Sequence, residues 1–328
     1  MKEIDVESVI ADLSHCDPEV LKIIQEVVDE LNLTDFNIHE IRENSLFRID
    51  TDSTSWFLKI RDSLSRNWIA QIFSRVKLQH EITVSRQVNV QQPQMVQAPR
   101  IFKTDNHRYI LFEFIPKSRP SDPLQIARSL VEFQNSGLQV RPHILLRIWY
   151  NDAVILLRSL MNCIKSRLLT WHEAARIVYV WSTLAASQPK LDFQFLSHGD
   201  FHQGNTMVNQ DGNLMFLDFE CTVFVKKWAF TDIVRFSRLH VTTGFIDNEV
   251  VSSYIEEFKA RYPERFNQLS VGIQIRLALI RKLVRQLCSG KRGCTKQEMK
   301  EFLNGTLLDD DKYESWFDEH VGFEYRES

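Results

Sequence analysis

The first third of the chain switches between strand-like and helix-like patterns of apolar residues. After Asp17-Pro18, a good N-terminal cap followed by a proline that starts helices, apolar residues recur at helical spacing over residues 20–31. Shorter apolar runs bounded by polar turns follow, as expected of strands. We predict helices within residues 1–32 and 66–90, and strands within 36–60, over 99–103 and over 109–115.

Beyond Pro116 the apolar pattern is mostly helical. Residues 117–123 contain two prolines and two serines, which is typical of a linker. Apolar residues then recur at helical spacing over 124–134, within 138–195 and within 248–305. The sequence therefore predicts a strand-rich first part followed by a mainly helical remainder.

A β-hairpin is predicted between the last two helical regions. Two short apolar runs, at residues 206–209 and 214–217, flank a polar stretch that contains Asp211-Gly212. An Asp-Gly pair between β-prone runs favours a tight turn, because glycine adopts a positive φ without steric cost. Folding back at this turn brings the residues before the first strand close to those after the second.

Three oxygen-bearing side chains lie at the two ends of this hairpin. Asp200 and Asn205 come before its first strand, and Asp218 follows its second. Carboxylate and amide oxygens are hard ligands and proton acceptors, which is the chemistry that Mg²⁺ and a phosphoryl group need. We therefore expect the three side chains to converge on one site.

The segments around these residues resemble the aminoglycoside phosphotransferase/choline kinase family of small-molecule kinases. The pattern is His198-Gly199-Asp200, then Asn205, then Leu217-Asp218-Phe219-Glu220. Protein kinases carry a His-Arg-Asp loop that ends in Asn, followed by Asp-Phe-Gly. Gly199 in the triplet and Glu220 at the last position are more similar to the small-molecule branch, and Asp-x-Glu is similar to choline kinase.

This resemblance implies a fold of the α+β class. The expected architecture is the protein-kinase-like bilobal fold, with an antiparallel sheet and an αC-type helix in the N-terminal lobe. A larger, mostly helical C-terminal lobe would carry the catalytic and acceptor-binding residues. The resemblance places the N-terminal nucleotide-binding lobe at residues 1–115 and the C-terminal lobe at 116–328.

The resemblance also implies roles for single residues around ATP and Mg²⁺. Asp200 is expected to be the catalytic base that accepts the proton of a hydroxyl group on a small molecule. Asn205 and Asp218 are expected to hold Mg²⁺. Lys59 is expected to contact the α- and β-phosphates, with Glu81 on the following helix pairing with it. The residues alone leave a second interpretation of Lys59 open, in which it lies on an outward-facing position of its strand.

Two further stretches are assigned to the nucleotide by the same resemblance. The family usually has a Gly-x-x-Asn segment before the lysine strand, and here Asn44-Ser45 matches its second half without the glycine. Backbone amides around Asn44 and Ser45 are therefore the expected phosphate contacts. At the hinge between the lobes, main-chain groups of Glu113, Phe114 and Ile115 are the expected contacts to the adenine edge.

Downstream of the hairpin, Asp232 resembles the family's aspartate that braces the catalytic loop through hydrogen bonds. His198 is expected to pack under that loop. A different interpretation of His198, Asp200 and His202 is a zinc or di-metal set, since Gly-Asp-x-His also opens the metallophosphoesterase signature. That class needs two later motifs that the chain lacks.

The acceptor is not determined by the sequence. Trp149, Tyr150, Trp171, Tyr179 and Trp181 lie in the helical stretch at 138–195, where aromatic residues form either a cage for a quaternary ammonium group or ordinary core. Basic residues outnumber acidic ones in this stretch, which argues against a polycationic aminoglycoside. An acidic run after residue 308 is either part of an acceptor site or a solvated surface. A degenerate kinase-like protein that binds without transfer, and a protein kinase, remain alternatives.

Composition sets the remaining limits. The chain has 328 residues and a formal net charge of -3, so it gives no sign of a nucleic-acid or membrane partner. No apolar run is long enough to span a bilayer, and residues 1–5 do not resemble a secretion signal. The five cysteines are scattered, which predicts reduced thiols and a cytoplasmic protein. A monomer or homodimer is expected.

Overall fold

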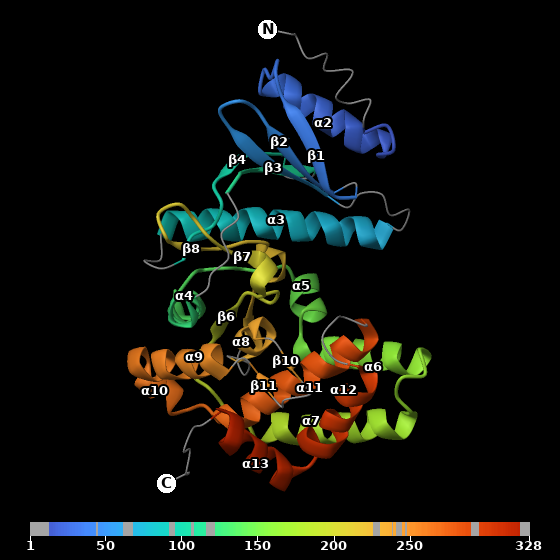
Figure 1. The fold of residues 1–328 in the computed structure, drawn as a ribbon, viewed down its shortest axis with the longest axis vertical. Helices are drawn as coiled ribbons and strands as arrows, with labels where there is room; N and C mark the ends of the chain where they lie inside the picture. Colours follow the sequence, from blue (N-terminus) through green and yellow to red (C-terminus); the bar gives the residue numbers. More distant parts are fainter. Residues whose placement is uncertain are drawn as a thin grey trace.

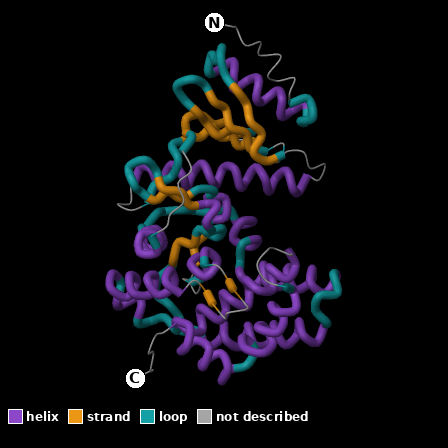
Figure 2. Tube along the Cα trace, in the orientation of Figure 1, coloured by secondary structure: helices purple, strands orange, loops and turns teal. Residues whose placement is uncertain are grey.

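The computed structural model describes residues 13–43, 45–61, 68–91, 96–105, 108–115, 122–225, 230–237, 239–240, 245–246, 248–289 and 295–321. The five-stranded sheet lies in the part of the molecule that holds the first third of the chain, and most of the rest is helical apart from short strand pairs (Figure 2). The strands are β1 (Asn37–Arg42), β2 (Leu46–Asp50), β3 (Ser55–Ile60), β4 (Ile101–Asp105), β5 (Tyr109–Glu113), β6 (Phe195–Ser197), β7 (Thr206–Val208), β8 (Leu214–Phe216), β9 (Val223–Val225), β10 (Leu239–His240) and β11 (Phe245–Ile246).

The α-helices are α2 (Pro18–Glu30), α3 (Trp68–Gln91), α4 (Pro123–Asn135), α5 (Ile144–Trp149), α6 (Asp152–Lys165), α7 (Trp171–Ser187), α8 (Thr231–Phe236), α9 (Asn248–Arg261), α10 (Pro263–Phe266), α11 (Val271–Ser289), α12 (Lys296–Phe302) and α13 (Asp310–Val321). Two 3₁₀ turns, η1 (Gln203–Asn205) and η2 (Phe219–Cys221), flank the β7–β8 hairpin, and a π-helical turn, η4 (Leu303–Leu307), follows α12.

An antiparallel five-stranded sheet with the order β1-β2-β3-β5-β4 forms the centre of the N-terminal lobe. Alternate residues point to opposite faces of a strand, so each face of the sheet packs on a different helix. Phe47, Leu58 and Leu111 pack with α2, whereas Ile110 and Phe112 pack with α3. Figure 1 shows the sheet between these two helices.

The predicted cap of the first helix is present. Asp17 accepts a hydrogen bond from the backbone N–H of Glu19 at 2.8 Å, and Pro18 occupies the first helical position. Val20, Ile24 and Val27 lie on the buried side of α2, as their helical spacing predicted. Residues 1–12, which the sequence also assigned to this region, lie outside the described residues.

Most of the C-terminal lobe is helical and has its own extensive core. Helix α11 packs against α6, α7 and α8, and α4 packs against α9. The second half of α3 reaches this core, since Val84 and Val88 are buried in it. Helix α3 therefore contacts both lobes, and it runs across the molecule between them (Figure 1). The division at residues 1–115 and 116–328 stays a prediction.

The predicted hairpin is confirmed. Strands β7 and β8 pair antiparallel, and Gly212 in the connecting turn has a φ of +81°. The side chain of Asn209 accepts hydrogen bonds from the backbone N–H groups of Asp211 and Asn213, at 3.0 and 2.8 Å, which fixes the turn. Strands β6 and β9 form a second short pair next to the hairpin, so the residues between β6 and β7 are held at both ends.

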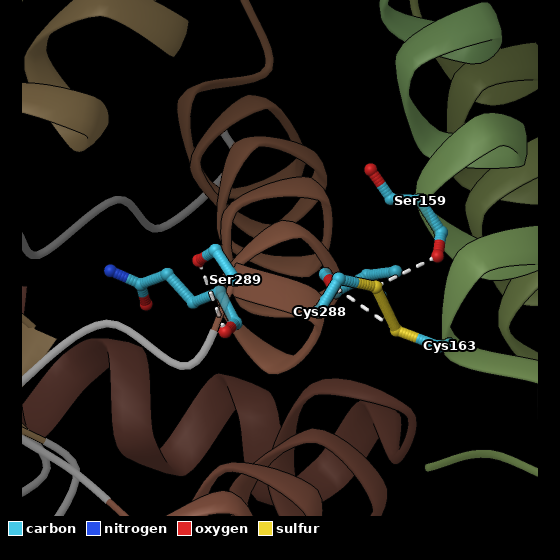
Figure 3. The surroundings of a disulfide bond; sticks show 6 residues. Ser159, Cys163, Cys288 and Ser289 are labelled. Carbon is cyan, nitrogen blue, oxygen red and sulfur yellow. Dashed lines mark hydrogen bonds between the residues drawn. A yellow bond between two sulfur atoms is a disulfide. The ribbon is translucent and has the colours of Figure 1, made fainter. Parts of the chain in front are cut away.

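The prediction that all five cysteines are reduced is wrong. Cys163 of α6 and Cys288 of α11 form a disulfide, with their Cα atoms 5.4 Å apart (Figure 3). The two residues are 125 positions apart in the sequence, and only the packing of α6 against α11 brings them together. Cys16 and Cys221 are free and buried, and Cys294 lies outside the described residues.

No helix in the described ranges is long and apolar enough to cross a membrane.

Candidate active site

An ion pair links the sheet of the N-terminal lobe to α3. The Nζ atom of Lys59, on β3, lies 2.7 Å from a carboxylate oxygen of Glu81, whose side chain is only 3% exposed. Lys59 pairs across the sheet with Ile110, which packs on α3, so the lysine points to that helix and not outward. The predicted Lys59–Glu81 pair is therefore present.

The same lysine reaches the far end of the hairpin. Lys59 Nζ lies 2.9 Å from Asp218 and 3.6 Å from Glu220, and Glu220 also binds Lys77 of α3 at 2.7 Å. Asp218 has a φ of +61°, a left-handed conformation that aspartate tolerates better than most residues. This backbone conformation turns the chain from β8 into η2 and aims both carboxylates at the lysines.

The carboxylates of Glu81, Asp218 and Glu220 form a compact acidic group around Lys59. Their oxygens lie within 4.8 Å of one another. Burial, followed by the charges of Asp218 and Glu220, raises the pKa of Glu81 to about 7 against the opposing effect of Lys59. Burial would lower the pKa of Lys59, but the three carboxylates outweigh it and hold this pKa well above its ordinary value. Lys59 thus forms ion pairs with all three carboxylates, and Lys77 lies beside them.

The loop that carries Asp200 is held by Asp232 of α8. The fully buried carboxylate of Asp232 accepts hydrogen bonds from the backbone N–H groups of His198 and Gly199, at 2.8 and 3.0 Å, and from the hydroxyl of Ser197 at 3.1 Å. Gln134 donates a fourth at 3.3 Å. The predicted bracing role of Asp232 is therefore seen in the structure.

Gly199, between His198 and Asp200, occupies a position that only glycine fits. Its φ is +77°, and a Cβ atom there would meet the carbonyl oxygen of Cys221. The glycine in place of the protein-kinase arginine therefore reflects a close approach of this loop to η2.

Asn205 connects the two ends of the hairpin. Its side-chain amide donates to the carbonyl of Asp200 at 3.0 Å, and its own carbonyl accepts from the backbone N–H of Leu217 at 2.9 Å. These bonds join the backbone before the hairpin to the backbone after it, so its two ends meet as predicted, whereas the convergence of the side chains of Asp200, Asn205 and Asp218 stays a prediction. Because the Asn205 amide nitrogen is engaged, its oxygen is the atom oriented to bind a ligand.

Sequence reasoning missed the closest neighbour of Asp200. Arg235 of α8 contacts Asp200 Oδ1, and its second guanidinium nitrogen donates to the carbonyl of Gly199 at 2.6 Å. His202 lies 3.8 Å from the other oxygen, Oδ2. Arg235 is three residues after Asp232, one turn further along α8, and this spacing was the only available signal.

His198 cannot join a metal set with Asp200 and His202. It is fully buried, its Nε2 lies 2.9 Å from the carbonyl oxygen of Leu217, and its ring packs against Phe201 and Phe219. Burial lowers the pKa of His198 to about 4, so the ring is neutral at pH 7. The structure therefore supports a packing role under the loop.

A cleft of about 650 Å³ opens beside the acidic group, a typical size for a small-molecule site. Lys59, Lys77, Glu81, Asn205, Asp218 and Glu220 line one part of it. Ile115, Met207 and Leu217 form an apolar part, and they pack in one cluster with Met215. The cleft thus combines a charged end with an apolar slot, and no sequence motif pointed to Met207.

The structure changes two of the predicted nucleotide contacts, those to the phosphates and those to the adenine. The N–H of Ser45 donates to the carbonyl of Arg42 at 3.1 Å, so this amide is not available to a phosphate. The Ser45 hydroxyl instead lines the cleft, buried and without a hydrogen-bond partner in the described part of the chain. Asn44 lies outside the described residues.

At the hinge, the backbone N–H groups of Glu113 and Phe114 donate within the sheet, to Arg100 and Ser55. Glu113 and Ile115 line the cleft, whereas Phe114 packs against Phe57. The expected adenine contacts are thereby narrowed to carbonyl groups and the amide of Ile115.

The donor set of the cleft suits Mg²⁺. Asp218 and Glu220 supply carboxylates and Asn205 an amide oxygen, all hard ligands. With Lys59 and Lys77 against Glu81, Asp218 and Glu220, the formal charges leave an excess of one negative charge, which favours the binding of a cation.

The five aromatic residues considered for a cage do not come together. Trp149 lines the cleft from α5, and the ring centroid of Tyr150, the next residue, lies 5.8 Å from Lys77 Nζ. Trp171 and Tyr179 are exposed on α7, which lies at the other end of the helical lobe (Figure 1). Trp181, also on α7, is buried.

Comparisons with known proteins agree with this geometry. The model of the phosphotransferase enzyme family matches residues 38–258. No curated protein sequence matches the chain. Among solved structures, the choline kinase LicA from Streptococcus pneumoniae is 13% identical with a TM-score of 0.56, over 92% of this chain and 99% of that chain.

Two antibiotic phosphotransferases are similar to the same degree. The streptomycin-ATP-APH(2")-IIa complex is 13% identical with a TM-score of 0.56, over 86% of this chain and 95% of that chain. The AMP-bound spectinomycin phosphotransferase APH(9)-Ia is 15% identical with a TM-score of 0.53, over 90% and 94%. Identities this low show the fold alone, and they confirm the predicted bilobal, protein-kinase-like α+β fold.

Proposed function

Since the chain belongs to the phosphotransferase enzyme family, we propose that it transfers the γ-phosphoryl group of ATP to a hydroxyl group of a small molecule. The observation that carries this proposal is the meeting of Lys59 and Asp218 at 2.9 Å, since the two lie on different lobes and 159 positions apart. The structural neighbours solved with AMP and ATP support nucleotide binding in the cleft.

On the nucleotide side, the chain supplies charge and a flat apolar slot. Ile115, Met207 and Leu217 would enclose the adenine ring. Lys59, oriented by Glu81, would exchange its contact with Asp218 for the α- and β-phosphates. The Ser45 hydroxyl would donate to a phosphate oxygen in place of the glycine-rich loop that the sequence lacks.

When bound by Asp218 and Asn205, Mg²⁺ would neutralise charge on the β- and γ-phosphates. The hydrogen bond from the Asn205 side chain to the Asp200 carbonyl would fix the position of the metal ligand relative to the base. Glu220, held by Lys77, would remain available as a further carboxylate.

Asp200 would act as the base. The acceptor oxygen forms a bond to the γ-phosphorus, the bond between that phosphorus and the bridging oxygen breaks, and ADP leaves with the electron pair. The proton of the hydroxyl passes to Asp200. Arg235 contacts Oδ1 of Asp200, so the hydroxyl would approach Oδ2, on the side of His202.

The proposal is tested with purified protein, ATP, Mg²⁺ and a panel of hydroxyl acceptors. Asp200→Ala should lose about 10²- to 10⁴-fold in turnover and keep its nucleotide affinity, because base catalysis is worth about that much. Asp218→Ala should lose Mg-nucleotide binding itself. An Asp200→Ala protein with unimpaired turnover would refute the assignment, and transfer to protein substrates alone would favour a protein kinase. A cytoplasmic location and a monomeric or dimeric state belong to the same proposal.

A further inference from the structure

Helices α6, α8 and α11 each bring an arginine to the region beside Asp200. Arg235 of α8 contacts Asp200, and Arg281 of α11 contacts Asp152 at the start of α6. Helix α11 packs against both α6 and α8 (Figure 1). The charge of Asp152 also acts on Arg235, where it opposes the lowering of the Arg235 pKa by burial.

Two more arginines, Arg158 and Arg285, lie in this region and form no ion pair with a carboxylate of the described residues. Arg158 of α6 stacks on the ring of Trp149, with 4.2 Å from its guanidinium carbon to the ring centroid. Its Nη1 atom is buried and has no hydrogen-bond partner in the described part of the chain. Arg285, one turn beyond Arg281 on α11, is exposed and forms no ion pair with any described residue.

We call Arg158, Arg235, Arg281 and Arg285 the arginine cluster. Burial lowers the pKa of Arg158 and Arg235, and the charges of Arg285 and, for Arg235, also Arg281 lower them further. The four cations face two carboxylates, those of Asp152 and Asp200. A half-buried excess of positive charge is costly unless an anion compensates it.

The lysine in this region does not belong to the ligand-binding set. Lys282 donates from Nζ to the carbonyl of Val234 at 2.6 Å and to that of Ser237. Lys282 therefore caps the C-terminal end of α8, the helix that carries Arg235. Burial, followed by the charge of Arg235, lowers the pKa of Lys282 to about 7, so this lysine is only partly charged at neutral pH.

We propose that the arginine cluster binds an oxyanion, a carboxylate or phosphate, carried by the acceptor whose hydroxyl reaches Asp200. This inference rests on the proposed function. The planar guanidinium group donates two parallel hydrogen bonds, which matches either oxyanion. Trp149 connects the cluster to the cleft, because it lines the cleft and packs on Arg158.

The same features disfavour a cationic acceptor. Choline and aminoglycosides carry positive charge, which the cluster would repel. The face of Trp149 that could hold a quaternary ammonium is already covered by Arg158. The acceptor class therefore differs from the substrates named for the structural neighbours.

A first experiment measures anion binding without nucleotide or acceptor. Inorganic phosphate is titrated into four proteins in a calorimeter, and its dissociation constant is measured for each. The proteins are the wild type, Arg158→Gln, Arg285→Gln and Lys165→Gln. Lys165 is an exposed cation at the end of α6, two turns after Arg158, and serves as the matched control. Each arginine variant should bind phosphate about ten-fold more weakly, as expected for the loss of one charge-assisted hydrogen bond, and Lys165→Gln should bind as the wild type does. Equal affinities in all four proteins would overturn the proposal.

A second experiment compares alcohols that differ only in charge: glycerol, glycerate, glycerol phosphate and choline. The wild type should have the highest kcat/KM for an anionic member, and the better of glycerate and glycerol phosphate identifies the oxyanion. Arg285→Gln should raise KM for that compound about ten-fold, and the control Lys165→Gln should leave it unchanged. Preference for glycerol or choline would overturn the inference and leave the proposed function standing. If no alcohol is phosphorylated, the proposed function fails, and the phosphate titration still decides whether the cluster binds anions.

Discussion

Replacing Asp232 by alanine should displace the loop that carries Asp200 and leave nucleotide binding unchanged. The change removes the acceptor of four hydrogen bonds and leaves two backbone N–H groups without this partner, that of His198, which is buried, and that of Gly199, which is half-buried. The hydroxyl of Ser197 can rotate to another acceptor, so it contributes less to the loss.

The magnitude follows from the two backbone donors. An unsatisfied buried donor costs about 1–3 kcal/mol, which gives about 2–6 kcal/mol for the pair. Burial raises the pKa of Asp232 in spite of its four hydrogen bonds, so the native charge is itself under-compensated. Removing that charge returns part of the cost, and we expect a net loss of about 2–4 kcal/mol in the free energy of unfolding.

The assay combines urea unfolding with steady-state kinetics. Asp318→Ala, which removes an exposed carboxylate from α13, is the control and should unfold as the wild type does. In Asp232→Ala, turnover should fall about 10²-fold because Asp200 is no longer held in place, whereas the affinity for Mg-ATP stays the same. A variant that matches Asp318→Ala in both stability and turnover would show that the brace contributes nothing.

Three further predictions concern the loop and the core. Because the pKa of His198 is lowered to about 4, the unfolded chain binds the proton more readily between pH 4 and 6.5, so stability falls as the pH drops through this window. The wild type should lose about 2 kcal/mol more than His198→Gln between pH 7 and 5 in urea unfolding, and equal losses would exclude the buried neutral ring. Gly199→Ala should destabilise the protein by more than about 1 kcal/mol and abolish turnover, since it strains the backbone against Cys221; wild-type kinetics would contradict this. Cys288→Ser opens a covalent loop of 125 residues and should lower the free energy of unfolding by about 2–5 kcal/mol, and an unchanged unfolding midpoint under oxidising conditions would argue against the disulfide.

Local signals in the sequence were sufficient for the strand-rich first part, the helical remainder and the hairpin, whereas the bilobal fold was predicted from the family resemblance. The cap at Asp17-Pro18 and the turn at Asp211-Gly212 are short-range features, and both appear in the structure. The pairing of Lys59 with Glu81 depended on a resemblance, because spacing alone left the direction of the lysine open.

Contacts between distant segments could not be predicted. The Cys163–Cys288 disulfide depends on how α6 and α11 pack, and no spacing rule reports that. Arg235 and Arg285 look like ordinary helix-surface residues in the sequence, and only the packing of α8 on α11 brings them towards Asp200. The charge of the acceptor site is therefore a property of the tertiary structure.

The most direct test of the whole account is a crystal structure with Mg²⁺ and a non-hydrolysable ATP analogue. We predict the metal about 2.0–2.1 Å from oxygens of Asp218 and Asn205, with Lys59 on the α- and β-phosphates and the γ-phosphate facing Asp200. A nucleotide bound outside this cleft, or a metal held without Asp218, would contradict it.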